Sequence, residues 1–339
     1  MELLRILAMF LVLLIHSVFL QDGFPSPSEV VDAPLPRFTD LFLFGGAAVC
    51  VDTFVLISGW FGIHPSKKSF SALVFMVIFY FFVGNLIGLA NGTVPTDSKT
   101  LFNMATLSTE YWFVYAYIGL YLLAPVLNTY IDHTSPENLR KTLLFFYLLQ
   151  TWYGWFRPQE AAFFMGGYST LSFIGLYLLA RYLRLYFPYR RIIPAKAFMG
   201  YGLMTFVIAT IAFLSLYLNI GTTLIHLHFQ YISPLVILSA VLLLLGFAQL
   251  RLSDHPWINR LGTSAFAVYL IHTHNGIYGY MHDAVEALQH LQLFYPLYLV
   301  ALLTLLSLIY LFCTALDQIR IRIWQSLQKR FITGPTPER

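Results

Sequence analysis

The chain has 339 residues, of which 58% are hydrophobic and only 11% are charged, whereas soluble domains carry roughly 25% charged residues. The mean hydropathy is +0.69. Sixteen acidic and twenty basic side chains are too few to cover a soluble core of this size. The composition therefore excludes a soluble enzyme, a disordered chain and a secreted disulfide scaffold, and it indicates a polytopic membrane protein.

Apolar stretches recur along the whole chain. A bilayer core about 30 Å thick requires about 20 apolar residues per helix, and ten stretches qualify. They predict an all-α bundle of about ten transmembrane helices in one domain, residues 1–316, followed by a basic cytoplasmic tail, 317–339, that begins as an amphipathic helix. The predicted helices are 2–20, 41–63, 69–90, 111–131, 142–157, 168–186, 197–219, 231–250, 261–281 and 293–313.

The segments between these helices differ in charge. If the N-terminus is cytoplasmic, most basic residues fall on the inner segments, while Arg37, Lys99 and Arg157 fall outside. Basic residues favour the cytoplasmic side, so the pattern predicts that both termini are inside, as in a multi-pass protein of a bacterial inner membrane. The outer segment 21–40 contains four prolines and is predicted to be irregular.

The two cysteines, Cys50 and Cys313, both lie in apolar runs. Such residues are typically small core side chains, so we predict neither a disulfide nor a metal site. The first apolar run begins at Leu3 and is not followed by a small-residue cleavage site. It is therefore predicted to be a retained helix rather than a signal peptide.

Few polar residues stand at membrane depth. In the first helix, Arg5 and His16 are separated by about three helical turns, so they face one side, roughly 16 Å apart along the axis. Asp52 and His272 lie near the middle of their helices. His274 faces away from His272 and is interpreted as structural. Ionisable residues inside a membrane indicate function by default, and together these residues predict either a transport path or a buried reaction chamber.

Four segments, taken in order, resemble the integral-membrane acyltransferase 3 family. The first is the pair Arg5 and His16, separated by ten residues. The second-helix segment leads from an acidic residue into Phe, Ser-Gly and an aromatic residue, and two further segments follow on a middle and a late helix. These three segments are 51–61 (VDTFVLISGWF), 111–128 (YWFVYAYIGLYLLAPVLN) and 261–272 (LGTSAFAVYLIH). The details look most like members found in bacterial surface-polysaccharide clusters.

The resemblance implies transfer of an acetyl or other short acyl group from acyl-CoA to a hydroxyl of a cell-surface glycan or its lipid-linked precursor. Acetyl-CoA would then be a co-substrate, with no tightly bound cofactor, no metal and no nucleic acid. A neutral histidine can remove the hydroxyl proton near pH 7, so His16 is the expected general base. Arg5 would hold the phosphate or pantetheine end of the donor or orient the chamber.

The resemblance assigns supporting roles to further residues. Asp52 or His272 would fix the tautomer of His16, directly or through water. The remaining expected site residues are Ser58, Glu110 and Trp112 for substrate or support, and Lys67 and Lys68 for the donor. Many relatives carry an Arg-rich pair where this chain has the two lysines, and many carry His at the position of Glu110. Lysine lacks the bidentate fork of arginine.

Two other function classes also use polar residues at membrane depth. A transporter or flippase would use the polar residues as a path, but no inverted pair of Gly/Pro-broken helices stands out. A glycan polymerase would be expected to carry a larger charged outer loop, whereas segment 21–40 contains a single arginine. The expected partners are therefore the acyl-CoA donor, a glycan or lipid-linked sugar, and membrane lipid.

Overall fold

The computed structural model describes residues 1–19, 23–105, 111–157, 163–221, 223–250 and 253–331. Within these ranges every regular element is a helix, as predicted. Six helical segments are long and apolar enough to cross a membrane, which supports a multi-pass protein; the count of ten and the orientation remain predictions. These segments are Pro34–Phe61, Lys67–Asn91, Trp112–His133, Pro194–Tyr217, Leu227–Ala248 and Tyr295–Gln328.

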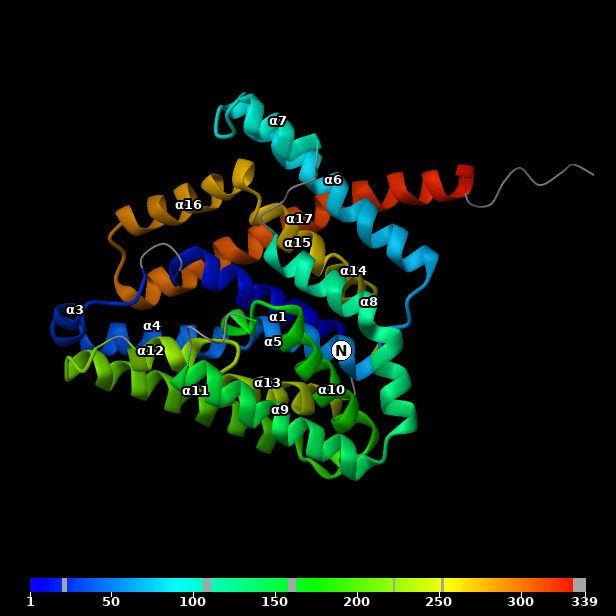
Figure 1. The fold of residues 1–339 in the computed structure, drawn as a ribbon. Helices are drawn as coiled ribbons and strands as arrows, with labels where there is room; N and C mark the ends of the chain where they lie inside the picture. Colours follow the sequence, from blue (N-terminus) through cyan, green and yellow to red (C-terminus); the bar gives the residue numbers. More distant parts are fainter. Residues whose placement is uncertain (20–22, 106–110, 158–162, 222, 251–252, 332–339) are drawn as a thin grey trace, which may run out of the picture. The chain divides into compact units, whose positions relative to one another are not determined.

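The chain divides into two compact units, and each is described by itself. Unit 1 comprises Met1, residues 3–65 and residues 112–254, whereas unit 2 comprises Glu2, residues 66–111 and residues 255–339. The elements of unit 1 are α1 (Glu2–Leu14), η1 (Ile15–Phe19), α3 (Pro27–Asp32), α4 (Pro34–Ala47), α5 (Cys50–Phe61), α8 (Trp112–His133), α9 (Pro136–Phe156), η2 (Met165–Gly167), α10 (Thr170–Leu185), η3 (Tyr189–Arg191), α11 (Pro194–Tyr217), α12 (Thr223–Phe229) and α13 (Pro234–Ala248). Helix α11 packs against α4 and α13, and α10 packs against α5, α8 and α9 (Figure 1).

Helices α5 and α10 pack closely together in unit 1 at Gly59 of α5. A Cβ atom on Gly59 would lie 2.7 Å from the carbonyl oxygen of Tyr177 and 2.8 Å from the Cβ of Ala180, both on α10. The glycine therefore allows the two backbones to approach one another. The glycine of the Ser-Gly pair in the second-helix segment therefore has a packing role.

The end of α5 is tied to α8 and α10 by a buried hydrogen-bond network. The backbone N–H of Ile63 donates to the Tyr177 hydroxyl over 3.0 Å, and that hydroxyl donates to Asn128 Oδ1 over 2.6 Å. Asn128 Nδ2 donates in turn to the carbonyl oxygen of Ile63 over 2.9 Å. Backbone groups that α5 leaves free where it ends thus receive side-chain partners.

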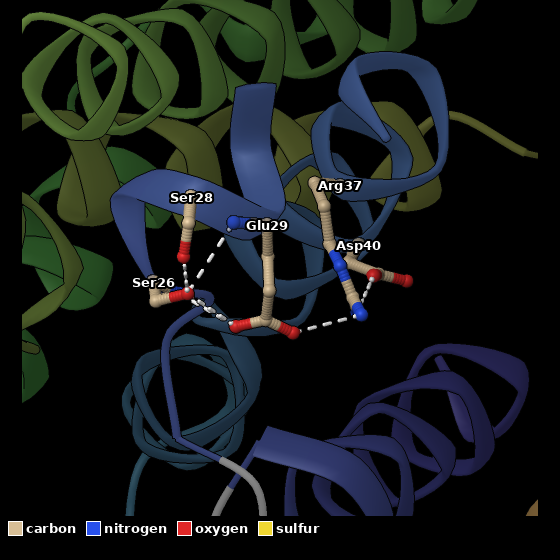
Figure 2. A network of polar contacts seen from close by, with 5 residues as sticks. All are labelled: Ser26, Ser28, Glu29, Arg37 and Asp40. Atoms are coloured by element: carbon tan, nitrogen blue, oxygen red, sulfur yellow. Dashed lines mark hydrogen bonds and ion pairs between the residues drawn. The ribbon is translucent and has the colours of Figure 1, made fainter. Parts of the chain in front are cut away.

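The prediction that segment 21–40 is irregular is wrong for its described residues after Ser26. Ser26 Oγ accepts from the Glu29 backbone, and the Glu29 carboxylate accepts from the Ser26 backbone over 2.8 Å, so a capping box starts α3 (Figure 2). Pro27 and Pro34 occupy first-turn positions of α3 and α4. There a proline favours a helix because no N–H is needed. Two of the four prolines in this segment are thus the first residues of helices.

Unit 2 is built around a long helix at each end of its sequence. Its elements are α6 (Lys67–Asn91), α7 (Ser98–Ala105), α14 (Pro256–Thr263), α15 (Ala265–His272), α16 (Asn275–His290) and α17 (Tyr295–Phe331). Helix α6 packs against α15, α16 and α17. Helix α17 runs without a break through residues 316 and 317, where the sequence predicts the change from domain to tail.

The single helix predicted over residues 261–281 is wrong, because this segment forms parts of α14, α15 and α16. Ser264 has a ψ of −2° at the first break, and His274 is extended (ψ 131°) at the second. His274 Nδ1 accepts from the Gly276 N–H over 3.0 Å and caps α16. The histidine interpreted as structural is thus the N-cap of α16, two residues after α15 ends.

Three glycines bring α6 close to the start of α16. A Cβ atom on Gly84 would lie 2.3 Å from the ring of His274, and one on Gly276 would lie 2.3 Å from the Gly84 carbonyl oxygen. Gly88 also contacts Gly276, so Gly84 and Gly88 act as a small-xxx-small pair of the kind that packs membrane helices.

The C-terminal part of α17 is linked to α6 through the buried carboxylate of Asp317, which also forms an ion pair with Arg320 of its own helix. The side chain of Asp317 is fully buried, and its Oδ1 accepts from Tyr80 over 2.8 Å and from Arg320 over 2.7 Å. The ring of Trp324 stacks on Phe75, with centroids 4.8 Å apart. The segment that the sequence assigns to a tail is therefore packed into unit 2 as far as these residues.

Candidate functional site

The helix that carries Arg5 and His16 changes its geometry between them. Helix α1 ends at Leu14, and residues 15–19 form the π-helix η1, which packs against α4. Both side chains are half-buried. Because a π-helix turns more slowly per residue, the even spacing assumed for this pair does not hold beyond Leu14. Short π-helices occur frequently at functional sites, so the position of His16 within one strengthens its candidacy.

Arg5 and Ser58 are brought together by Tyr117, which the sequence reasoning missed. The Ser58 and Tyr117 hydroxyl oxygens are 3.3 Å apart, and Ser58 Oγ donates to the Phe54 carbonyl oxygen over 3.1 Å. Since the serine hydrogen is used in that bond, the Tyr117 hydroxyl donates to Ser58. Tyr117 also interacts electrostatically with Arg5. Tyr117 lies five residues after the expected site residue Trp112, within the segment that resembles the family.

Asp52 is the most unusual polar residue of unit 1. Its side chain is fully buried, and neither carboxylate oxygen has a hydrogen-bond partner among the residues that the structure describes. Consequently Asp52 does not hold His16 by a direct hydrogen bond here. The buried Tyr147 hydroxyl of α9 likewise lacks a partner within the described ranges, and Asp52 interacts electrostatically with Tyr147 and Tyr231. Buried polar groups without partners are rare in native structures.

Aromatic rings gather around Trp112 at the start of α8. Its ring lies 4.4 Å from that of Tyr168 and is stacked on that of Tyr231 at 6.3 Å, measured between centroids. Tyr168 and Tyr231 are themselves 5.0 Å apart. Sequence reasoning selected Trp112 but not the two tyrosines, because they lie more than fifty residues further along the chain. Glu110, the other residue expected here, lies outside the described residues.

The remaining expected site residues belong to unit 2. His272 is buried, and its Nδ1 lies 2.6 Å from the carbonyl oxygen of Val268, one turn earlier in the helix. Because a carbonyl oxygen only accepts, Nδ1 carries the proton and Nε2 is the basic nitrogen. Lys67 and Lys68 are exposed in the first turn of α6. The structure thus groups Arg5 with Ser58 in unit 1 and places His272 and both lysines in unit 2.

One group of metal-ligand side chains lies on the surface of α16. Atoms of His282, Asp283 and Glu286 come within 4.8 Å of one another. His282 Nδ1 is 3.7 Å from Glu286 Oε2, one turn along the same helix. A helical ion pair at an exposed surface accounts for this group. It is separate from the residues expected from the sequence.

The helices and the buried polar residues together define a multi-pass membrane protein with ionisable groups inside its apolar body. The sequence model of the family described as an acyltransferase domain matches residues 1–314. The chain therefore belongs to the acyltransferase 3 family. The match includes Arg5, His16, Asp52 and His272, and it ends just before the anchored segment of α17.

No curated protein and no solved structure matches the chain.

Proposed function

We propose that the protein is an integral-membrane O-acyltransferase that moves an acetyl group from acetyl-CoA to a hydroxyl of a cell-surface glycan or its lipid-linked precursor. The observation that carries the proposal is the family membership over residues 1–314, which includes the Arg5–His16 pair. The proposed setting is a bacterial inner membrane, with both chain termini in the cytoplasm.

The proposed reaction uses His16 as the general base. As the acceptor hydroxyl oxygen attacks the thioester carbonyl carbon, His16 takes the hydroxyl proton. A new C–O bond forms, and the resulting tetrahedral intermediate collapses with cleavage of the C–S bond. The thiolate of CoA leaves and recovers the proton from His16. One acetyl ester and one thiol are formed, and the histidine is again neutral.

Arg5 has the proposed role of binding the donor or orienting the chamber. Its electrostatic interaction with Tyr117, whose hydroxyl contacts Ser58, supports this role because Arg5 then lies near other polar groups of unit 1. If Arg5 binds the donor, Arg5→Ala will raise the KM for acetyl-CoA more than it lowers kcat. A fall in turnover at unchanged donor saturation would instead make Arg5 part of the chemical step.

The acceptor side of the proposal rests on the aromatic group at Trp112. Rings that carry a polar edge, such as those of Tyr168 and Tyr231, offer an apolar face together with a hydrogen-bonding hydroxyl. A sugar ring has the same combination of C–H faces and hydroxyls. The buried Asp52 and Tyr147, both without partners in the described structure, supply further hydrogen-bonding capacity to unit 1.

Mass spectrometry of surface glycans tests this function and identifies the acyl group by its mass. Cells that lack the protein are compared with cells complemented by the wild type or by His16→Ala at equal membrane abundance. We expect ester-linked acetyl groups with the wild type alone. Undiminished acetylation with His16→Ala would remove His16 from the mechanism, and identical glycans in all three strains would contradict the proposed acceptor. The transporter alternative is not favoured, because the matching family is one of acyltransferases.

A further inference from the structure

A basic pocket lies in unit 1 where the chain passes from α10 to α11. It has a volume of about 390 Å³, and three arginines, Arg184, Arg190 and Arg191, line it together with Tyr189. None of the lining residues that the structure describes is acidic. Ligand pockets for small molecules begin at about 300 Å³. The pocket is therefore large enough for a phosphate group and part of the molecule that carries it.

The side chain of Arg184 packs against aromatic residues of the core. The Arg184 guanidinium lies 5.0 Å from the ring centroid of Trp60 and 5.4 Å from that of Tyr189, and it donates to the Tyr189 hydroxyl. Trp60 is nearly fully buried and belongs to the second-helix segment of the family resemblance. Arg184 is thus oriented by cation–π contacts. A basic residue that only sets the orientation of the protein in the membrane does not need such contacts.

The turn that carries the other two arginines is also fixed. Tyr189, Arg190 and Arg191 form the short 3-10 helix η3, and the Tyr189 ring packs edge-on against Trp60, with centroids 4.8 Å apart. Gln249 Nε2 donates to the Tyr189 carbonyl oxygen over 2.8 Å. Arg190 lies 6.0 Å from the Tyr189 ring centroid. One buried tyrosine therefore contacts two of the three arginines.

Three arginines around one pocket repel one another unless an anion lies between them. Basic residues on an inner segment satisfy the positive-inside rule wherever they stand, and lysine would serve equally well. The rule requires neither a pocket nor an arginine that packs on aromatic rings. Arginine is preferred where phosphate oxygens are bound by paired N–H donors. The composition, the pocket and the fixed geometry thus point to the same ligand chemistry.

We infer that the pocket at Arg184, Arg190 and Arg191 binds a phosphate group. Two sources share this chemistry, namely the nucleotide end of the CoA donor and the headgroup of a phospholipid. The donor assignment rests on the proposed function, whereas phosphate binding does not. With the donor as the source, these arginines supply the bidentate donors that Lys67 and Lys68 lack.

The binding test uses the full-length protein in phosphatidylcholine nanodiscs. The nucleotide probe is adenosine 3′,5′-bisphosphate, which carries phosphates like those of CoA but has no thioester. The lipid probe is phosphatidylglycerol, whose retention by the protein is measured by native mass spectrometry. The test variant is R190Q/R191Q, and Arg184 is left intact because it packs on Trp60. The matched control is Arg140→Gln, an exposed arginine of unit 1 outside the pocket.

Binding of at least one probe is expected to weaken about tenfold or more in R190Q/R191Q and to stay unchanged in Arg140→Gln. Loss of nucleotide binding identifies the donor as the source, and loss of phosphatidylglycerol alone identifies a lipid. Binding of both probes at wild-type strength, or of neither probe by the wild type, overturns the inference. The conservative R190K/R191K variant keeps both positive charges and is expected to bind the probe with intermediate strength. Such a graded loss would show that the weaker binding of R190Q/R191Q does not come from misfolding.

The two proposals fail in different ways. The bisphosphate has no acyl group, so its binding is independent of catalysis. If glycan acetylation is absent while the bisphosphate binds through the arginines, the proposed function is wrong and the phosphate pocket stands. If acetylation is normal in R190Q/R191Q and both probes bind as in the wild type, the pocket inference is wrong and the proposed function stands.

Discussion

The Tyr177 hydroxyl joins three helices of unit 1 through Asn128, to which it donates a 2.6 Å hydrogen bond while accepting from the Ile63 N–H. Asn128 ends one of the segments that resemble the family, and Tyr177 lies on α10. In the structure their contacts are with each other and with the backbone at the end of α5. We therefore assign them to the framework that holds α5, not to the reaction.

Tyr177→Phe tests this framework. The substitution removes one partner from the Ile63 N–H and one from Asn128 in a buried place, which costs about 1–3 kcal/mol. Thermal unfolding in detergent should show a lower midpoint for this variant. Tyr182→Phe, on the same helix, is the control and should leave the midpoint unchanged. Equal midpoints for Tyr177→Phe and Tyr182→Phe would contradict the assigned role.

Gly59→Ala tests the close approach of α5 and α10. The added methyl group would lie 2.7 Å from a backbone carbonyl oxygen, so the helices must separate, at a cost of about 1–3 kcal/mol. Gly202→Ala on α11 is the matched control, because nothing lies within 4 Å of a Cβ there. Alanine is the better helix former by roughly 1 kcal/mol. The two substitutions should therefore shift the unfolding midpoint in opposite directions, and a shift of the same sign would refute the argument.

The pH dependence of α3 follows from its capping box. Hydrogen bonds from the Ser26 backbone and hydroxyl, and the charge of Arg37, hold the pKa of Glu29 below its ordinary range. Arg37 Nη2 lies 2.9 Å from Glu29 Oε1 (Figure 2). A lowered pKa means that the ionised form stabilises the fold at neutral pH. This contribution fades as the pH falls below about 4.3, the usual glutamate value, towards the folded pKa.

Hydrogen exchange of the α3 amides measures this effect. Exchange corrected for its intrinsic pH dependence should accelerate in acid for the wild type, and Glu29→Gln should remove most of that acceleration. Because Glu29 is nearly half exposed, solvent screens the ion pair and the effect stays local. If exchange in Glu29→Gln accelerated in acid as much as in the wild type, the acceleration would have to come from another titratable group.

The buried ion pair of unit 2 provides a prediction for the end of α17. Arg320→Met leaves the Asp317 carboxylate without its charged partner, which costs about 3–5 kcal/mol in buried pairs. Replacing both partners, as in D317L/R320M, should recover much of that loss. Arg322→Met, an exposed neighbour, should be neutral. Limited proteolysis of the C-terminal segment compares the wild type with these three variants, and cleavage should be fastest in Arg320→Met. Equal cleavage rates in all four proteins would contradict the anchoring of α17.

Much of the architecture follows from composition and apolar runs. The bounds of α6, α10, α11 and α13 lie within a few residues of the predicted ones, because long apolar segments have little alternative to a helix in a membrane. The expectation that both cysteines are unpaired and buried is also confirmed. Family motifs found Arg5, His16 and Asp52, although their roles remain predictions.

Features set by local backbone chemistry were harder to foresee. Counting residues per turn gave no sign of the π-helix at His16 or of the break at His274, because each depends on hydrogen bonds specific to that place. Prolines in segment 21–40 suggested a loop, yet with Ser26 and Glu29 they start helices. The sequence did not predict Tyr117 and Tyr147 as site residues, because tyrosines are common in apolar helices. Only their contacts in the structure distinguish them.

The central claim is that His16 catalyses acyl transfer, and its most direct test is release of the CoA thiol. Purified protein is given acetyl-CoA and extracted lipid-linked glycan, and the new thiol is measured for the wild type, His16→Ala and His133→Ala. His133 is an exposed histidine of α8 and serves as the control. Removing a general base lowers the rate about 10²–10⁴-fold, so His16→Ala should lose nearly all release while His133→Ala retains it. Equal release by the wild type and His16→Ala would contradict the claim.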